Sequence, residues 1–120
     1  MLQFIRFHLI TASTVLLLCV PNAFIRVTHA QSKKCNAEGV SISRTGKIAT
    51  EVTFINQRSQ TVKVYWLDYS GKRKFYSSIQ PGDRVSQSTY VTHPWVVTDT
   101  QDNCLGVYYP DGQPRIVEIN

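Results

Sequence analysis

The sequence predicts an all-β fold, and two observations carry that prediction. Short runs of alternating apolar and polar residues recur along residues 31–120, separated by turn residues at nearly regular spacing. No segment in this range repeats its apolar residues with the period of an amphipathic helix. Seven or eight strands in about ninety residues suit two packed sheets, so we expect a seven- to eight-stranded antiparallel β-sandwich.

The expected strands follow from the two-residue alternation. The run around Val52 and Phe54 alternates with polar neighbours before a turn that starts at Asn56, and the run 62–67 alternates in the same way. These two runs are expected to form a β-hairpin. The other expected strands are a weaker one near Val40, then 74–78, 84–90, 95–99, 104–109 and 115–119. The intervening turns are Ser70-Gly71, Gln80-Pro81-Gly82-Asp83, Gln101-Asp102-Asn103 and Pro110-Asp111-Gly112.

The first thirty residues have the composition of a secretory signal peptide. A basic start precedes an apolar run over 9–20, and the small residue Ala30 ends the segment, which predicts cleavage after Ala30. We expect residues 1–30 to be a signal peptide and residues 31–120 to be one secreted or periplasmic domain without membrane contact. The alternative is a retained anchor, but Pro21 interrupts the run before the roughly 20 apolar residues that a bilayer requires.

Export would leave two of the three cysteines. Cys19 lies in the leader, so the mature domain keeps Cys35 and Cys104. Two cysteines in an oxidising compartment can form one disulfide with no free thiol left over, and we predict a Cys35–Cys104 disulfide. Closing a loop of about seventy residues stabilises a fold by roughly 4 kcal/mol in the chain-entropy model. The alternative is two separate buried thiols. Neither cysteine lies in a CxxC motif, so a metal site is not expected.

The mature chain is mildly basic. Removing Arg6 and Arg26 with the leader lowers the Lys and Arg count from 13 to 11, against eight Asp and Glu. The only dense basic cluster is Lys72-Arg73-Lys74, which follows Gly71 and is expected to be a solvated turn. We therefore expect no nucleic-acid partner, while contact with an anionic surface polymer stays open.

Five side chains supply the chemistry of a small binding site: Trp66, Tyr76, Thr89, His93 and Trp95. They fall on successive expected strands and turns. Aromatic walls with a few polar groups grip a compact, partly polar ligand, so the segment predicts a binding site and not a catalytic one. Each residue also has a structural explanation. Trp66, for example, shares a strand face with Val62 and Val64, as a core residue would.

Enzymatic chemistry is not expected. His93 is the only histidine after the leader, and neither mature cysteine lies in a recognised nucleophile motif. The spacing of Asp99, Asp102 and Asp111 matches neither an EF-hand nor a known acidic metal cluster. The sequence also has no phosphate-binding glycine loop. We expect no enzyme activity, no metal and no cofactor.

The same region carries a family resemblance. The segments that carry it are Phe54-Ile55-Asn56, Tyr65-Trp66-Leu67-Asp68-Tyr69-Ser70-Gly71, Phe75-Tyr76, Gln80-Pro81-Gly82 and Ser88-Thr89-Tyr90-Val91-Thr92-His93-Pro94-Trp95. In this order and spacing the chain resembles the β domain of the von Hippel-Lindau tumour suppressor family. The likeness runs without a gap from Phe54 to Trp95 and more loosely to the C-terminus. It implies a β-sandwich whose surface pocket accepts a 4-hydroxyproline in an extended peptide.

The resemblance implies a role for each of the five site residues. Trp66 and Trp95 would form apolar walls against the pyrrolidine ring. The Tyr76 hydroxyl would hold a peptide carbonyl. Thr89 and His93 would together meet the hydroxyl of the ligand.

Two positions depart from the family pattern. Thr89 stands where the family has serine, which keeps the hydroxyl oxygen and adds a methyl group. Pro94 lies between His93 and Trp95 and stiffens the backbone beside the imidazole.

The function expected from the sequence is a secreted peptide- or protein-binding module for a hydroxyproline-containing extended peptide. The chain stops at Asn120, directly after the last expected strand, so we expect no counterpart of the family's helical domain and no ubiquitin ligase adaptor as a partner. Two other classes stay open. One is a carbohydrate or anionic surface-polymer binding domain, in which the tryptophans would stack on sugar rings; the other is a structural domain with an idle pocket.

Overall fold

The computed structural model describes residues 30–33 and 35–120. The predicted signal peptide, residues 1–30, therefore lies outside the described residues except for Ala30. Ala30 is buried against the core, and its backbone N–H donates to the carbonyl oxygen of Ile116. In the part of the chain that is described, no helix has the length and apolar character needed to cross a membrane.

Within the described residues the chain forms eight strands and one short 3₁₀ helix. In order, these are β1 (Gln31–Lys33), η1 (Cys35–Gly39), β2 (Ala49–Asn56), β3 (Val62–Leu67), β4 (Arg73–Ile79), β5 (Arg84–Tyr90), β6 (Trp95–Thr98), β7 (Cys104–Tyr109) and β8 (Arg115–Ile119). The predicted all-β fold is confirmed. Strands β3, β5, β7 and β8 begin and end at the predicted residues, β6 ends one residue early, and β4 is one residue longer at each end. The short polar strand β1 is not predicted.

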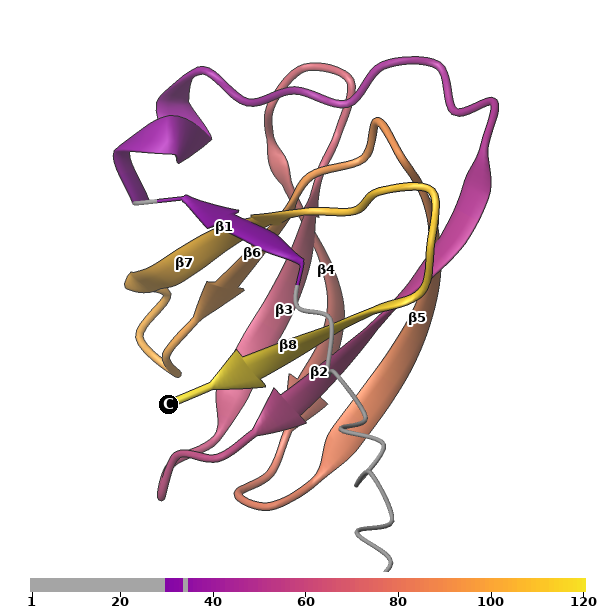
Figure 1. Cartoon of the computed structure of the whole chain (residues 1–120). Helices are drawn as coiled ribbons and strands as arrows, with labels where there is room; N and C mark the ends of the chain where they lie inside the picture. The colour runs from indigo at the N-terminus through magenta and orange to yellow at the C-terminus, as the bar shows by residue number, and fades with distance from the viewer. Residues whose placement is uncertain (1–29, 34) are drawn as a thin grey trace, which may run out of the picture.

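The strands form two sheets that pack as a sandwich (Figure 1). One sheet has the order β1-β7-β6-β3-β4, and the other has the order β5-β2-β8. Strand β2 shows how the sequence directs this packing. Its residues alternate, with Val52, Phe54 and Asn56 buried and the residues between them more exposed. The core cluster joins Phe54 of one sheet to Val64 and Trp95 of the other.

The predicted hairpin between the run around Val52 and the run 62–67 is wrong. Strand β2 pairs with β5 and β8, whereas β3 pairs with β4 and β6, so the chain crosses between the sheets after Asn56. Alternation alone does not separate these cases, because a turn within a sheet and a crossing between sheets both direct the apolar face to one core.

One strand pair also departs from the predicted antiparallel arrangement. Strands β2 and β8 run parallel, whereas every other strand pair in the described part of the chain is antiparallel. The alternation of side chains has the same period in both kinds of pair, so it carries no information about strand direction.

The predicted strand near Val40 is wrong as well. The chain leaves η1 and runs without regular structure over residues 40–48, across one end of the sandwich, to β2 (Figure 1). Its large apolar side chains face solvent, with exposed fractions of 83% for Val40, 48% for Ile42 and 58% for Ile48. Its backbone forms hydrogen bonds with η1 and with the turns that follow β3 and β5.

The structure contains the predicted Cys35–Cys104 disulfide. The bond joins η1 to the first residue of β7 across a sequence separation of 69 residues. The two Cα atoms lie 5.9 Å apart, which is an ordinary spacing for a disulfide.

At the end of β2, the Asn56 side chain joins the β2–β3 turn to the end of β4. The side chain is fully buried, and its Nδ2 donates to the carbonyl oxygens of Gln60 at 2.8 Å and Ile79 at 2.9 Å. Its Oδ1 accepts from the backbone N–H of Arg58 at 2.9 Å. The buried amide is therefore well satisfied, as polar groups inside proteins usually are.

Candidate functional site

A cavity of about 300 Å³ opens between the two sheets, at the end of the sandwich where β5 leads into β6. The structure brings all five predicted site residues to it: Trp66, Tyr76, Thr89, His93 and Trp95. The remaining lining residues are Ala49, Thr50, Ser88 and Tyr90. The volume lies at the lower end of the range for small-molecule sites, which suits one ring-sized group.

Trp95 connects the cavity to the core. Its side chain is only 2% exposed and packs edge-on against Phe54, with ring centroids 6.0 Å apart. Its Nε1–H donates to Thr89 Oγ1 at 2.9 Å, and this bond joins β6 to β5 of the other sheet. Because the Thr89 oxygen accepts from the indole, the proton of the same hydroxyl stays available to a ligand.

A β-bulge in β4 turns Tyr76 toward the cavity. The pairing of β3 with β4 shifts register after Val64, so that Tyr65 opposes Phe75 and Tyr76 is the extra residue. A bulge redirects the side chain of its extra residue. Phe75 therefore packs against Tyr65 with ring centroids 5.7 Å apart, whereas Tyr76 packs edge-on against Trp95 at 4.9 Å.

Trp66 forms a second wall of the cavity and is only partly buried. It lies opposite Trp95 in the pairing of β3 with β6, and its ring lies 5.1 Å from the imidazole of His93 at an angle of 33°. Its Nε1–H donates to Ser43 Oγ at 2.6 Å. A core role, which the strand pattern allows for Trp66, therefore fits Trp95 better than Trp66.

His93 lies in the turn between β5 and β6, only 9% exposed. The rings of Trp66, Tyr69 and Tyr90 surround the imidazole, with centroids 5.1, 5.6 and 5.2 Å away. Burial lowers the pKa of His93 below the ordinary value of 6.5, and a hydrogen bond with the Arg44 backbone partly opposes this shift. The imidazole is therefore neutral at neutral pH. The ring donates to the Arg44 backbone, and a neutral imidazole keeps its other nitrogen as an acceptor. Its Nε2 lies 3.4 Å from the Tyr69 hydroxyl, which is a long hydrogen-bond contact.

We expect the NMR titration of His93 to show an inflection below 6.5, because its buried ring disfavours the imidazolium form. The unfolded chain then takes up the proton at a higher pH than the folded chain. The free energy of unfolding should therefore fall as the pH drops through about 6.5, until the folded-state pKa is passed. His93→Gln should lack this loss, and an inflection at or above 6.5 would contradict the expectation.

The strand pattern does not reveal three further residues around the cavity. From the pattern alone, Tyr69 and Tyr90 are packing or surface tyrosines, yet both rings lie against His93. Tyr90 follows Thr89 directly, so the two-residue alternation places it on the opposite face of β5. Thr50 lies opposite Thr89 in β2, and its Oγ1 is buried without a hydrogen-bond partner among the described residues.

The basic cluster 72–74 does not form one surface. Arg73 is half-buried and pairs with Glu38, whereas Lys74 Nζ lies 5.9 Å from the ring centroid of Trp66. Lys72 is exposed. Among the described residues, no three or more His, Cys, Asp or Glu side chains gather closely enough to hold a metal ion.

Comparison with known proteins identifies the family. A family model described as the VHL beta domain matches residues 41–110, which is more than half of the chain. The chain belongs to the VHL beta domain family. The resemblance inferred from the sequence is thereby confirmed, and the two-sheet sandwich is consistent with it.

One curated relative is Protein Vhl of Drosophila melanogaster. It is 30% identical to this chain over 54 residues, which cover 45% of this chain and 30% of the relative. The chain therefore spans less than a third of the length of the curated relative it matches. Membership in the family supports a protein-binding module in general.

Proposed function

We propose that this domain is an exported module that binds a hydroxyproline in an extended peptide. The observation that carries the proposal is the meeting of Thr89 and His93 at one cavity with aromatic walls. Thr89 offers a hydroxyl proton, and the neutral imidazole of His93 offers an acceptor nitrogen. A ligand hydroxyl between the two would accept from Thr89 and donate to His93.

The shape of the cavity supports the same ligand. Trp66, Tyr76 and Trp95 present aromatic surface to a saturated five-membered ring. The ring of Tyr76 is anchored against both indoles, but the residue is 41% exposed. Its hydroxyl has no hydrogen-bond partner in the described part of the chain, so it is free to donate to a peptide carbonyl.

The sheet edges supply a path for the rest of the peptide. Strands β4 and β5 flank the cavity, and each is the edge strand of its sheet. An extended peptide can add main-chain hydrogen bonds to such an edge while one side chain enters the pocket. A proline-rich peptide also has restricted backbone freedom, which lowers the entropy lost on binding.

Two features support export. The leader has the order of a signal peptide, and the Cys35–Cys104 disulfide belongs in an oxidising compartment. By contrast, the indoles give little support to the carbohydrate alternative. Trp95 is nearly buried, and the ring of Trp66 lies against His93, so neither forms an open platform for a sugar ring.

The experiment is a calorimetric titration with two peptides that differ only in proline or 4-hydroxyproline. Plain proline would leave the proton of the Thr89 hydroxyl without a ligand partner, and it would leave His93 Nε2 with only its long contact, at 3.4 Å, to the Tyr69 hydroxyl. We therefore expect it to bind about 5- to 150-fold more weakly for each group left unpaired, from about 1 to 3 kcal/mol per group. The preference for the hydroxyproline peptide should weaken at acidic pH, because the imidazolium form of His93 has no acceptor nitrogen.

Paired variants sharpen the titration. Thr89→Ser keeps the hydroxyl and should keep the preference, whereas Thr89→Val keeps the shape and should lose it. His93→Phe keeps a flat ring but removes the acceptor, so it should also bind both peptides equally. Equal binding of the two peptides by the unaltered protein would refute the proposal and favour the idle-pocket interpretation.

A further inference from the structure

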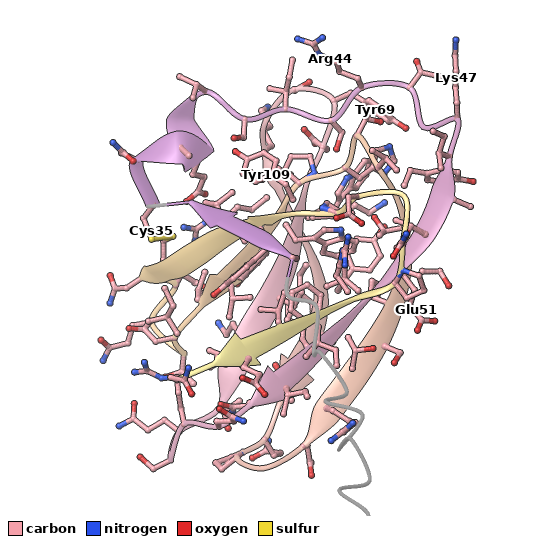
Figure 2. All side chains as sticks on the ribbon, viewed as in Figure 1. Cys35, Arg44, Lys47, Glu51, Tyr69 and Tyr109 are labelled. Carbon is pink, nitrogen blue, oxygen red and sulfur yellow. A yellow bond between two sulfur atoms is a disulfide. The ribbon has the colours of Figure 1, made fainter. Side chains whose placement is uncertain are left out.

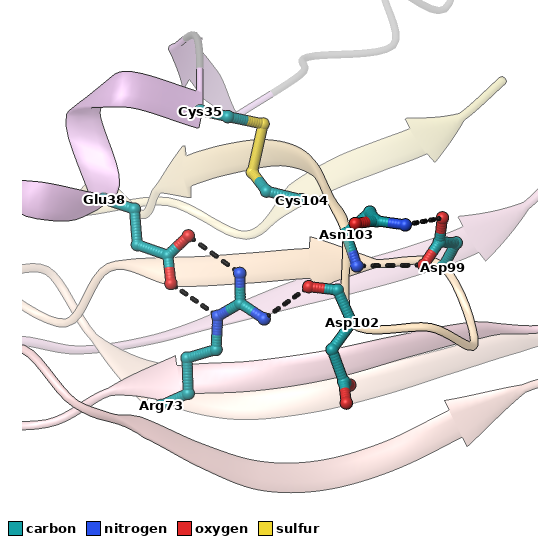
Figure 3. Close-up of a disulfide and its surroundings, with 7 residues drawn as sticks. All are labelled: Cys35, Glu38, Arg73, Asp99, Asp102, Asn103 and Cys104. Carbon is teal, nitrogen blue, oxygen red and sulfur yellow. Dashed lines mark hydrogen bonds and ion pairs between the residues drawn. A yellow bond between two sulfur atoms is a disulfide. The ribbon is translucent and has the colours of Figure 1, made fainter.

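Two anchors hold the start of the segment that precedes β2. We call residues 35–48 the arm. The Cys35–Cys104 disulfide ties its first residue to β7, and the Glu38 carboxylate forms a two-bond pair with the guanidinium of Arg73 in β4 (Figure 3). A pair of this geometry is among the stronger side-chain contacts. Arg73 also donates to the Asp102 carbonyl at 2.8 Å, in the turn before β7.

The far part of the arm bonds to the wall of the cavity. Ser43 Oγ donates to the carbonyl of Leu67 and accepts from the Nε1–H of Trp66, so one hydroxyl fixes that indole against β3. Further along, the backbone of Arg44 exchanges bonds with Thr92 and receives the ring N–H of His93. Arg44 and Tyr69 lie at the same end of the molecule in Figure 2.

Little apolar burial holds the arm in place. Val40, Ile42 and Ile48 have exposed fractions of 83%, 48% and 58%. A segment with few buried apolar contacts opens easily unless other bonds hold it. The position of the arm therefore depends on its hydrogen bonds and on the two anchors at its start.

We propose that the arm is a positioning element for the cavity, and that the Cys35–Cys104 disulfide makes its hold on Trp66 and His93 sensitive to reduction. The part that concerns ligand affinity rests on the proposed function. A dithiol reductant would supply two electrons and two protons to convert the S–S bond into two thiols, and would itself become a disulfide. The arm would then keep only its noncovalent contacts, and the two rings would lose their fixed orientation.

The test compares the two indole N–H groups of the full chain by NMR hydrogen exchange, without ligand. In Cys35→Ser/Cys104→Ser, exchange at Trp66 should accelerate about tenfold or more, because its partner lies on the arm. Exchange at Trp95, whose partner lies within the sandwich, should stay unchanged. Unchanged exchange at Trp66 would overturn the proposal. Equal acceleration at both indoles would also overturn it, because that result means general loosening of the fold.

A second readout follows the imidazole. In the same variant, the pKa of His93 should move toward 6.5, because the ring gains water when the arm is released. Ser43→Ala should accelerate exchange at Trp66 alone, and Ser43→Thr, which restores a hydroxyl, should reverse the effect. Ser86→Ala is the matched control, because it removes an exposed hydroxyl bond to Thr53 that has no contact with the arm. A response to Ser86→Ala equal to that of Ser43→Ala would contradict a specific role of the arm.

Peptide titration separates this inference from the proposed function. If the hydroxyproline peptide binds the unaltered protein, Ser43→Ala should weaken binding about tenfold, the size expected for one lost neutral hydrogen bond. Equal affinity in the presence of accelerated exchange at Trp66 would overturn the effect on affinity. If the unaltered protein binds neither peptide, the proposed function fails, and the exchange measurements still decide whether the arm positions the two rings.

Discussion

Replacing Trp95 by alanine should lower the free energy of unfolding by about 3–5 kcal/mol, as for other large aromatic side chains removed from a core. The indole is 2% exposed, and it packs against Phe54 of one sheet and Tyr76 of its own. Its N–H also satisfies the buried hydroxyl of Thr89. Because domains of this size are stable by only about 5–15 kcal/mol, urea denaturation should show a large shift of the midpoint.

The matched control is Trp95→Phe, which keeps a ring in the core but removes the indole N–H. Trp95→Phe should lower the free energy of unfolding clearly less than Trp95→Ala does, because volume and aromatic contacts are partly kept. A cost for Trp95→Ala below about 1 kcal/mol, the range of surface substitutions, would show that this indole is not part of the core. Loss of ligand binding in Trp95→Ala is therefore weak support for a ligand contact, and substitutions at Thr89 and His93 are better tests of the pocket.

The five site residues follow from their side-chain types and from the family resemblance, because the strand pattern alone also fits Trp66 to the core. The strand pattern does predict most of the strands, for a simple reason. Side chains on a half-buried strand alternate with period two. The ends of β5 (84–90) and β8 (115–119) can therefore be predicted from where the alternation starts and stops. The turns are equally local, because Gly82 and Gly71 both adopt positive φ, which glycine tolerates best. Strand ends and turns of this kind can be predicted without knowing which strands pair with one another.

Features that depend on partners distant in sequence could not be predicted. The bulge at Tyr76 appears only when β4 is placed against β3, and it decides which of Phe75 and Tyr76 faces the cavity. The sheet change after Asn56 depends on which strands β2 finds as neighbours. The division of roles between the indoles, with Trp95 in the core and Trp66 at the wall, likewise follows from packing and not from local pattern.

Asn56→Ala should lower the free energy of unfolding by about 3 kcal/mol, because it removes three hydrogen bonds from a fully buried position. The carbonyls of Gln60 and Ile79 would lose a donor, and the N–H of Arg58 would lose its acceptor. These partners belong to the β2–β3 turn and to the end of β4, so the loss should be visible as a lower midpoint in urea denaturation. The cavity lies at the other end of β2, and peptide affinity measured at low temperature should stay unchanged.

Asn56→Asp tests which atoms of the amide matter. The carboxylate can still accept from Arg58, but when ionised it cannot donate to the carbonyls of Gln60 and Ile79, and it places a charge in a fully buried site. Burial beside carbonyl oxygens should raise its pKa in the folded state, so the folded chain would bind a proton more tightly than the unfolded chain. The difference in free energy of unfolding between Asn56→Asp and Asn56→Ala should therefore shrink as the pH falls from about 7 to about 4, because the protonated acid regains one donor. A difference that stays constant over this range would show that the donor atoms of Asn56 do not hold the β2–β3 turn against the end of β4.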